Sequence, residues 1–273
     1  MKQFKSNKLA ASLAGGCLLS LVMAAQSAVA CTVDNWTGNS NTVTPGSVVA
    51  DSPSTISRYS GLCGMETAAS TTAWVQDDSP GGINRIRARF YVLLDITDVG
   101  RIYRGFNSGG SPIFDIAVNP VNGNISLVSS GQSAVCAGCA NVGGWNSIEI
   151  DWNAGGNQMS LIVNENAPVG SALSTGETVD FVRLGNLNGA AGTLSFDAYE
   201  SRRATAIGRL CVGDANLDGQ RGLADLEDIF AEFQFGTLAN GNPDADENGE
   251  IGIGDLEEVF QIFQFGTAGC PAP

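Results

Sequence analysis

Residues 85–94 read Arg-Ile-Arg-Ala-Arg-Phe-Tyr-Val-Leu-Leu. Every second residue from Ile86 to Leu94 is apolar, and most of the residues between them are basic or aromatic. A repeat of two residues matches the pleat of a β-strand, in which successive side chains point to opposite faces. The stretch therefore predicts a strand with one face in a core and the other face in solvent.

Shorter runs of the same kind follow along the chain, at 113–118, 124–128, 145–152, 159–163, 179–184 and 194–199. Turn signals rich in glycine separate the runs, at 80–82, 108–110, 122–123 and 154–156. No segment from Cys31 to Arg209 shows a sustained helical period. Many short strands joined by tight turns predict a mainly β fold, with a jelly-roll β-sandwich over residues 31–209.

The order of four of these runs resembles that of the concanavalin-like, laminin-G-type sandwich. A strand that begins with tryptophan covers 145–152, a hairpin strand covers 157–163, and Val182-Arg-Leu-Gly185 precedes a final strand with Phe-Asp at 192–199. The resemblance covers residues 64–205 and implies two packed sheets.

The end of the chain contains a repeat with an offset of 30 residues. The first copy, from Asp214, reads Asp-Ala-Asn-Leu-Asp-Gly-Gln-Arg-Gly-Leu-Ala-Asp, and the second, from Asp244, reads Asp-Ala-Asp-Glu-Asn-Gly-Glu-Ile-Gly-Ile-Gly-Asp. Each copy has oxygen-bearing side chains at positions 1, 3, 5 and 12 and a glycine at position 6. This is the spacing of an EF-hand calcium loop, in which the glycine permits a sharp turn around the ion.

A short amphipathic segment follows each loop, at 226–236 and 256–266. Apolar residues in these segments recur with the period of a helix, at Leu226, Ile229, Phe230 and Phe233, and again at Leu256, Val259, Phe260 and Phe263. The repeat therefore predicts two units, each made of a loop and a helix, within residues 210–273.

Residues 212–266 resemble the dockerin module, in which each loop ends in aspartate and one helix follows. The resemblance implies two bound calcium ions, the first held by Asp214, Asn216, Asp218, Gln220 and Asp225, and the second by Asp244, Asp246, Asn248, Glu250 and Asp255. Position 7, Gln220 or Glu250, would contribute its backbone carbonyl. Dockerins bind cohesins, so a cohesin-like protein is the expected partner, with an intramolecular or surface partner as the alternative. The chain departs from the family at Arg221 in position 8 and at positions 10 and 11 of both loops.

The charge of the chain excludes several function classes. All three lysines precede residue 31, so the remainder carries 11 arginines and 28 acids, a formal charge of −17. Nucleic acids and anionic membranes attract clustered positive charge, so we expect neither as a partner. The absence of histidine excludes Ser-His-Asp and Cys-His catalysis and zinc sites that use histidine.

Residues 1–30 have the pattern of a signal peptide. Lysines at 2, 5 and 8 precede an apolar run, and Ala28-Val-Ala30 has the form of a cleavage site. The run is too short for a permanent membrane span. We therefore expect secretion after cleavage at Ala30, with a lipoprotein anchored at Cys31 as the alternative.

Six cysteines remain after such cleavage, an even number that favours disulfides in an exported protein. Cys136 and Cys139 are close enough in the chain for a local structural disulfide, and no pattern around them indicates a redox motif. Cys211 and Cys270 flank the repeat, so we expect them to pair and close the module. Cys31 and Cys63 remain to pair with each other.

Two acids in the strand at 145–152 raise the question of catalysis. Glu149 and Asp151 alternate as in the strand motif of jelly-roll β-glucanases, but Asn153 stands where a third acid would donate the proton. An ordinary strand with Ser147, Glu149 and Asp151 in water is the favoured interpretation. Arg85, Arg87 and Arg89 could hold an anion, but a solvated face that pairs with nearby acids is favoured.

The sequence supports two hypotheses about function. In the first, a secreted, non-catalytic sandwich binds a glycan or a surface component, and the calcium-binding module docks it to a partner. In the second, the sandwich is a diverged glycoside hydrolase that acts on a polysaccharide and is carried on a dockerin. The missing third acid favours the first hypothesis.

Overall fold

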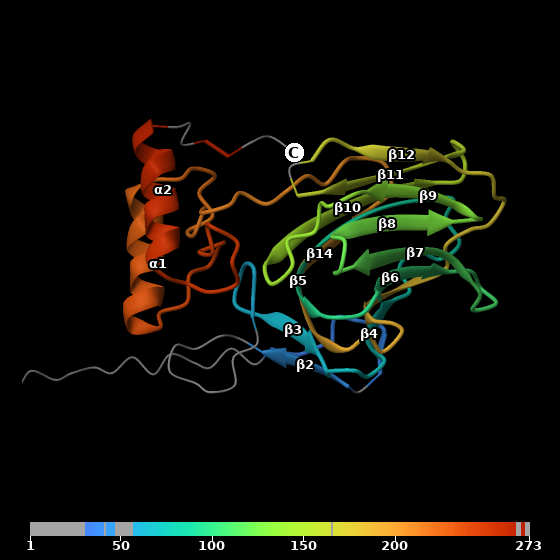
Figure 1. Ribbon diagram of the computed structural model, residues 1–273, viewed down its shortest axis with the longest axis horizontal. Helices are drawn as coiled ribbons and strands as arrows, with labels where there is room; N and C mark the ends of the chain where they lie inside the picture. Colours follow the sequence, from blue (N-terminus) through green and yellow to red (C-terminus); the bar gives the residue numbers. More distant parts are fainter. Residues whose placement is uncertain (1–30, 41, 47–56, 165, 266–268, 271–273) are drawn as a thin grey trace, which may run out of the picture.

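The computed structural model describes residues 31–40, 42–46, 57–164, 166–265 and 269–270. The expected signal peptide at 1–30 and the end of the second predicted helix at Gly266 lie outside these residues. The described chain folds into two packed β-sheets and a pair of helices beside them (Figure 1). No helix in this part of the chain is long and apolar enough to cross a membrane.

The first sheet, here called the β6 sheet, has seven antiparallel strands. Their spatial order is β1 (Gly38–Asn39), β4 (Ala73–Asp77), β13 (Phe181–Asn186), β6 (Gly100–Phe106), β7 (Pro112–Asn119), β8 (Asn124–Ser129) and β9 (Gln132–Cys136).

The second sheet, here called the β5 sheet, also has seven antiparallel strands. Their spatial order is β12 (Val169–Ala172), β11 (Gln158–Val163), β10 (Trp145–Asn153), β5 (Arg85–Ile96), β14 (Gly192–Arg202), β3 (Gly64–Thr67) and β2 (Val43–Gly46). The two sheets form a β-sandwich, which confirms the predicted mainly β fold.

The core lies between the two sheets and follows the predicted alternation. Along β5, the residues at 86, 88, 90, 92 and 94 are fully buried. Trp152 of β10 is also fully buried, and its indole N–H donates a hydrogen bond to Ser129 Oγ at 3.0 Å. A buried indole N–H needs such a partner, so this bond links the two sheets through the core.

The helical module follows the sandwich in the chain and has a small apolar core of its own. Helix α1 spans Leu223–Phe235, helix α2 spans Ile253–Phe265, and Ile229 and Val259 are the buried residues that join them. Both helices begin three residues earlier than predicted, inside the loop repeat. The carboxylate of Asp225 accepts a hydrogen bond from the Gly222 N–H, which stabilises this early first turn of α1.

The predicted apolar face of the helices is only partly buried. Phe230 and Phe233 of α1 are 46% and 41% exposed, and Phe260 and Phe263 of α2 are 45% and 50% exposed. The helices and their apolar periodicity are as predicted, and the small core of the module leaves these four phenylalanines partly exposed.

Three disulfides join consecutive cysteines of the described chain, Cys31–Cys63, Cys136–Cys139 and Cys211–Cys270. All three predicted pairs are confirmed. The last disulfide closes the helical module at its two ends.

Candidate metal centre

The second repeat loop brings three carboxylates together. Asp244, Asp246 and Asp255 each place an oxygen so that the three atoms lie within 4.8 Å of one another. Asp244 and Asp255 are 1% and 0% exposed, whereas Asp246 is at the surface. The arrangement puts negative charge around one point at the edge of the module.

Backbone donors hold the buried carboxylates of this loop in place. Asp244 accepts hydrogen bonds from the N–H groups of Asn248 at 3.1 Å and Gly249 at 2.8 Å. Asp255 accepts from Ala245 and Gly252, each at 2.7 Å. The carboxylates at positions 1 and 12 of the loop are therefore held in a fixed orientation, which is what a preorganised cation site would require.

The first loop repeats this arrangement. Asp214 accepts hydrogen bonds from Asp218 N–H at 3.1 Å and Gly219 N–H at 3.0 Å, and Asp225 accepts from Ala215 N–H at 2.8 Å. Asn216 replaces the aspartate at position 3, and Asp218 replaces the asparagine at position 5, so each loop has three carboxylates at positions 1, 3, 5 and 12. Asp218 and Gln220 lie on the exposed side of the loop.

The turn in each loop depends on glycine at position 6. Gly219 and Gly249 have φ values of 82° and 92°, which residues with a Cβ rarely adopt. Position 4 is also left-handed, at Leu217 with φ 65° and at Glu247 with φ 58°. The backbone thus curls around one centre in both loops, as the spacing of the repeat predicts.

The electrostatics of the loops fit a cation. Burial, followed by the nearby Asp255 carboxylate, raises the pKa of Asp244 to about 8. Burial also raises the pKa of Asp214 and of Asp255. Clustered oxygen donors whose charges repel one another are the ligands that calcium prefers, so the residues present fit this ion.

A residue that the sequence analysis missed fixes the second loop to the sandwich. Glu247, at position 4, accepts a hydrogen bond from Tyr59 Oη at 2.6 Å and forms an ion pair with Arg209. Its backbone carbonyl accepts a hydrogen bond from Trp145 N–H at 3.0 Å. In an acid-rich loop, no feature of the sequence distinguishes Glu247 from its neighbours.

Glu149 and Asp151, the two alternating acids of β10, have structural partners. The Glu149 carboxylate accepts hydrogen bonds from the N–H groups of Ile207 and Gly208, both at 3.0 Å. Asp151 binds both Arg85 and Arg87, at 2.6 and 2.8 Å. The expectation that Ser147, Glu149 and Asp151 lie in water is therefore wrong, because Ser147 is buried and both acids are engaged.

The arginines of β5 do pair with neighbouring acids, as favoured. Arg89, however, is 6% exposed and not solvated, and it pairs with Glu200 at 3.4 Å. The segment that leads into the helical module covers this part of the sheet, since Arg89 also donates to the Gly208 carbonyl. A connection between domains thus occupies the face that was expected to be open.

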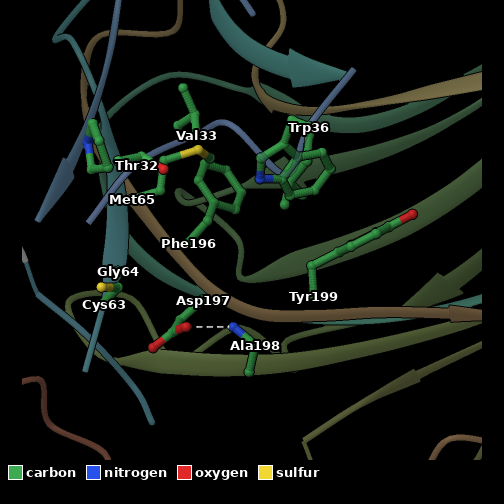
Figure 2. A pocket seen from close by; sticks show the side chains of 12 residues that line it. Thr32, Val33, Trp36, Cys63, Gly64, Met65, Phe196, Asp197, Ala198 and Tyr199 are labelled. Atoms are coloured by element: carbon green, nitrogen blue, oxygen red, sulfur yellow. Dashed lines mark hydrogen bonds between the residues drawn. The ribbon is translucent and has the colours of Figure 1, made fainter. Parts of the chain in front are cut away.

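A cavity of about 290 Å³ opens beside the first described residues (Figure 2). Its lining residues include Trp36, Phe196 and Tyr199, and the centroids of the Trp36 and Tyr199 rings are 4.9 Å apart. Its carboxylate, Asp197, is engaged by backbone N–H donors, including that of Ala198. The cavity accordingly lacks a free charged group, and we assign it no function.

Comparison with known proteins adds a likeness in fold. No protein-family model matches the chain, and no curated protein matches it. Among solved structures, "Cellulose induced protein, Cip1" matches at 13% identity over 67% of this chain and 92% of that one, with a TM-score of 0.45. An alginate lyase from Klebsiella pneumoniae matches at 9% identity over 52% of this chain and 82% of that one, with a TM-score of 0.38. An alginate lyase from Alteromonas sp. 272 matches at 12% identity over 54% of this chain and 82% of that one, with a TM-score of 0.34.

Proposed function

We propose that this chain is a secreted, non-catalytic protein in which a glycan-binding β-sandwich carries a dockerin-like module with two calcium ions. The observation that carries the proposal is the convergence of Asp244, Asp246 and Asp255 in a loop that the chain repeats 30 residues apart. One acidic turn is common on protein surfaces. Two such loops in register, each leading into a helix that packs on the other, favour a dedicated calcium module.

Calcium would neutralise the carboxylates that crowd each loop. The first ion is assigned to Asp214, Asn216, Asp218, Gln220 and Asp225, and the second to Asp244, Asp246, Asn248, Glu250 and Asp255. The protein contributes the oxygen donors and the left-handed turns, and the aspartates at position 12 connect each loop to the first turn of its helix. The positions of the two helices are thereby linked to occupancy of the loops.

The exposed helix faces support a docking role. Phe230, Phe233, Phe260 and Phe263 leave large apolar surfaces uncovered at equivalent positions of the two repeats. Contiguous exposed apolar side chains often mark sites of protein–protein contact. We assign these faces to a cohesin-like partner, in keeping with the resemblance of the module.

Calcium titration of the full chain tests the proposal. After removal of divalent ions, isothermal titration with calcium should report two sites per chain, and helical circular dichroism should increase on saturation. Asp246→Ala should weaken one site at least tenfold, and the matched Asn216→Ala should weaken the other. Magnesium serves as the control cation, because a loop of this kind should bind it more weakly. Absence of calcium uptake by the folded chain would contradict the proposal.

A further inference from the structure

The outer face of the β6 sheet carries a row of polar side chains across four adjacent strands. Arg183 of β13 lies directly opposite Gln76 of β4 on one side and Arg104 of β6 on the other. Asp115 of β7 continues the row next to Arg104. Val182 and Leu184 are in the core, so Arg183 points away from it.

Aromatic rings surround the Arg183 guanidinium. Its central carbon is 3.9 Å from the centroid of the Trp74 ring and 5.0 and 5.5 Å from those of Phe106 and Phe181. Phe106 and Phe181 stack on each other at 4.7 Å. Contacts within about 6 Å of a ring hold a cation in a defined orientation, so this guanidinium is fixed in place.

The charge around Arg183 is unbalanced. Arg104 and Arg101 share the carboxylate of Asp115, so three cations of this face have one anion in contact with them. In the part of the chain that the structure describes, no acid forms an ion pair with Arg183, whose Nε–H donates to Gln76 Oε1 at 2.8 Å. Burial and the neighbouring Arg104 lower the pKa of Arg183, and the charge of Asp78 opposes this shift.

This imbalance stands out in an acidic chain. The total formal charge is −14, and the arginines on the outer face of β5 each pair with an acid, Asp151 or Glu200. Two cations on adjacent strands repel each other, and the repulsion is relieved when an anion binds between them. The terminal nitrogens of Arg183 form a planar pair of donors that matches a carboxylate.

We propose that the outer face of the β6 sheet binds an acidic polysaccharide, with a uronate carboxylate received by Arg183 and Arg104. Gln76 orients Arg183 through its Nε–H, and the half-buried rings of Trp74 and Phe181 provide apolar contact for the sugar. A neutral glycan would leave the repulsion between the arginines unrelieved. A nucleic acid is disfavoured, because its dense line of phosphates would meet a strongly acidic protein. This inference rests on the proposed glycan binding and specifies the class of glycan.

Binding measurements on the full chain test the inference. Polygalacturonate is the probe, with neutral xylan and dextran sulfate as the comparison polysaccharides, and affinity electrophoresis reports the dissociation constant. We expect binding to polygalacturonate that weakens as the salt concentration rises, at least tenfold weaker binding to xylan, and weaker binding to dextran sulfate than to polygalacturonate. Equal binding to dextran sulfate would show attraction by charge alone and would overturn the carboxylate assignment.

Two variants separate the site from the overall charge of the protein. Arg183→Gln should weaken polygalacturonate binding at least tenfold, whereas Arg85→Gln removes the same charge from the β5 sheet and should change it less than twofold. Arg183→Lys retains the charge and loses the planar donor pair, so an intermediate affinity is expected. Unchanged affinity in Arg183→Gln, or equal losses in Arg183→Gln and Arg85→Gln, would overturn the proposal.

Failure of this inference can be told apart from failure of the proposed function. Calcium titration of the same samples reports the helical module independently of the sheet, and urea unfolding shows whether each variant is folded. Preference for xylan over polygalacturonate would retain a glycan-binding sandwich and overturn the assignment to acidic glycans. Absence of binding to all three polysaccharides would contradict both the inference and the glycan-binding part of the proposed function.

Discussion

Single polar residues connect segments that are far apart in this chain. Asp197 of β14 accepts hydrogen bonds from the N–H groups of Tyr59 at 2.6 Å and Ser60 at 2.9 Å, 138 and 137 residues away in the sequence. Burial raises the pKa of this carboxyl to about 6, although the three backbone donors oppose the shift. This one residue thus fixes the segment before β3 to β14, although burial makes the ionised form of its carboxyl less favourable.

The raised pKa predicts a dependence of stability on pH. The folded protein holds the Asp197 proton up to a pH of about 6, whereas the unfolded chain loses it near its ordinary pKa of about 4. The contribution of this group is therefore fully present below that value and is lost as the pH rises through 6. Between pH 5 and 7 the loss amounts to about 1 kcal/mol.

Urea unfolding of wild type and Asp197→Asn at pH 5, 6 and 7, in saturating calcium, measures this contribution. The free energy of unfolding of wild type should fall with pH more steeply than that of the variant. Other titrating groups are common to both proteins and cancel in the difference. Parallel pH profiles would show that Asp197 does not titrate in this range.

At the scale of elements, the two repeat loops are alike in backbone and differ in surroundings. Glu247 fixes position 4 of the second loop to Tyr59, Arg209 and Trp145, whereas Leu217 at position 4 of the first loop is 59% exposed. A non-glycine residue in the left-handed region is strained, and contacts from outside the loop stabilise it. The second loop is therefore the more preorganised of the two.

This difference predicts unequal calcium affinities. Glu247→Ala should weaken calcium binding at the second loop about five- to thirtyfold, because a contact network worth about 1–2 kcal/mol is coupled to the bound conformation. Tyr59→Phe keeps the carboxylate charge and removes only its hydrogen bond, so a smaller loss in the same direction is expected. Isothermal titration of both variants, with Leu217→Ala as the matched control in the first loop, makes the measurement. An unchanged affinity in Tyr59→Phe and Glu247→Ala would refute the coupling.

The elements also show what the sequence can predict. Seven strands with clear alternation were predicted and are present, namely β5, β7, β8, β10, β11, β13 and β14. Strand β6 was missed because register shifts between Arg101 and Tyr103, and again between Gly105 and Phe106, interrupt its alternation. Strands β1 and β2 have two and four residues and contain glycine or proline, so no pattern can develop in them. All three disulfides were predicted, and the ten proposed calcium ligands remain a prediction.

At the scale of the whole molecule, buried ionic contacts join the helical module to the sandwich. Arg58 and Glu232 form an ion pair with side chains only 2% and 5% exposed, across 174 residues of sequence. Glu232 also accepts a hydrogen bond from Ala239 N–H at 2.8 Å. Contacts between residues so distant in the chain leave no local pattern, and the sequence analysis therefore could not find this interface.

Removal of the buried carboxylate should destabilise the protein strongly. In Glu232→Ala, Arg58 stays buried without its acid, and loss of one partner of a buried pair typically costs about 3–5 kcal/mol. Glu227→Ala removes an exposed acid from the same helix and should change the free energy of unfolding by less than about 0.5 kcal/mol. Urea unfolding followed by tryptophan fluorescence compares the two variants, and equal stability of both would show that the ion pair does not join the two parts.

The disulfides have a consequence for the order in which the protein matures. The six cysteines that the structure describes allow 15 pairings, and they use the one in which each cysteine bonds to the next along the described chain. A chain emerges from the ribosome with its N-terminus first, so Cys63 meets Cys31 before any later thiol of the described chain exists. No later cysteine is needed for an earlier pair to form. We therefore expect oxidation in the order of synthesis to give the native pairs without thiol–disulfide reshuffling.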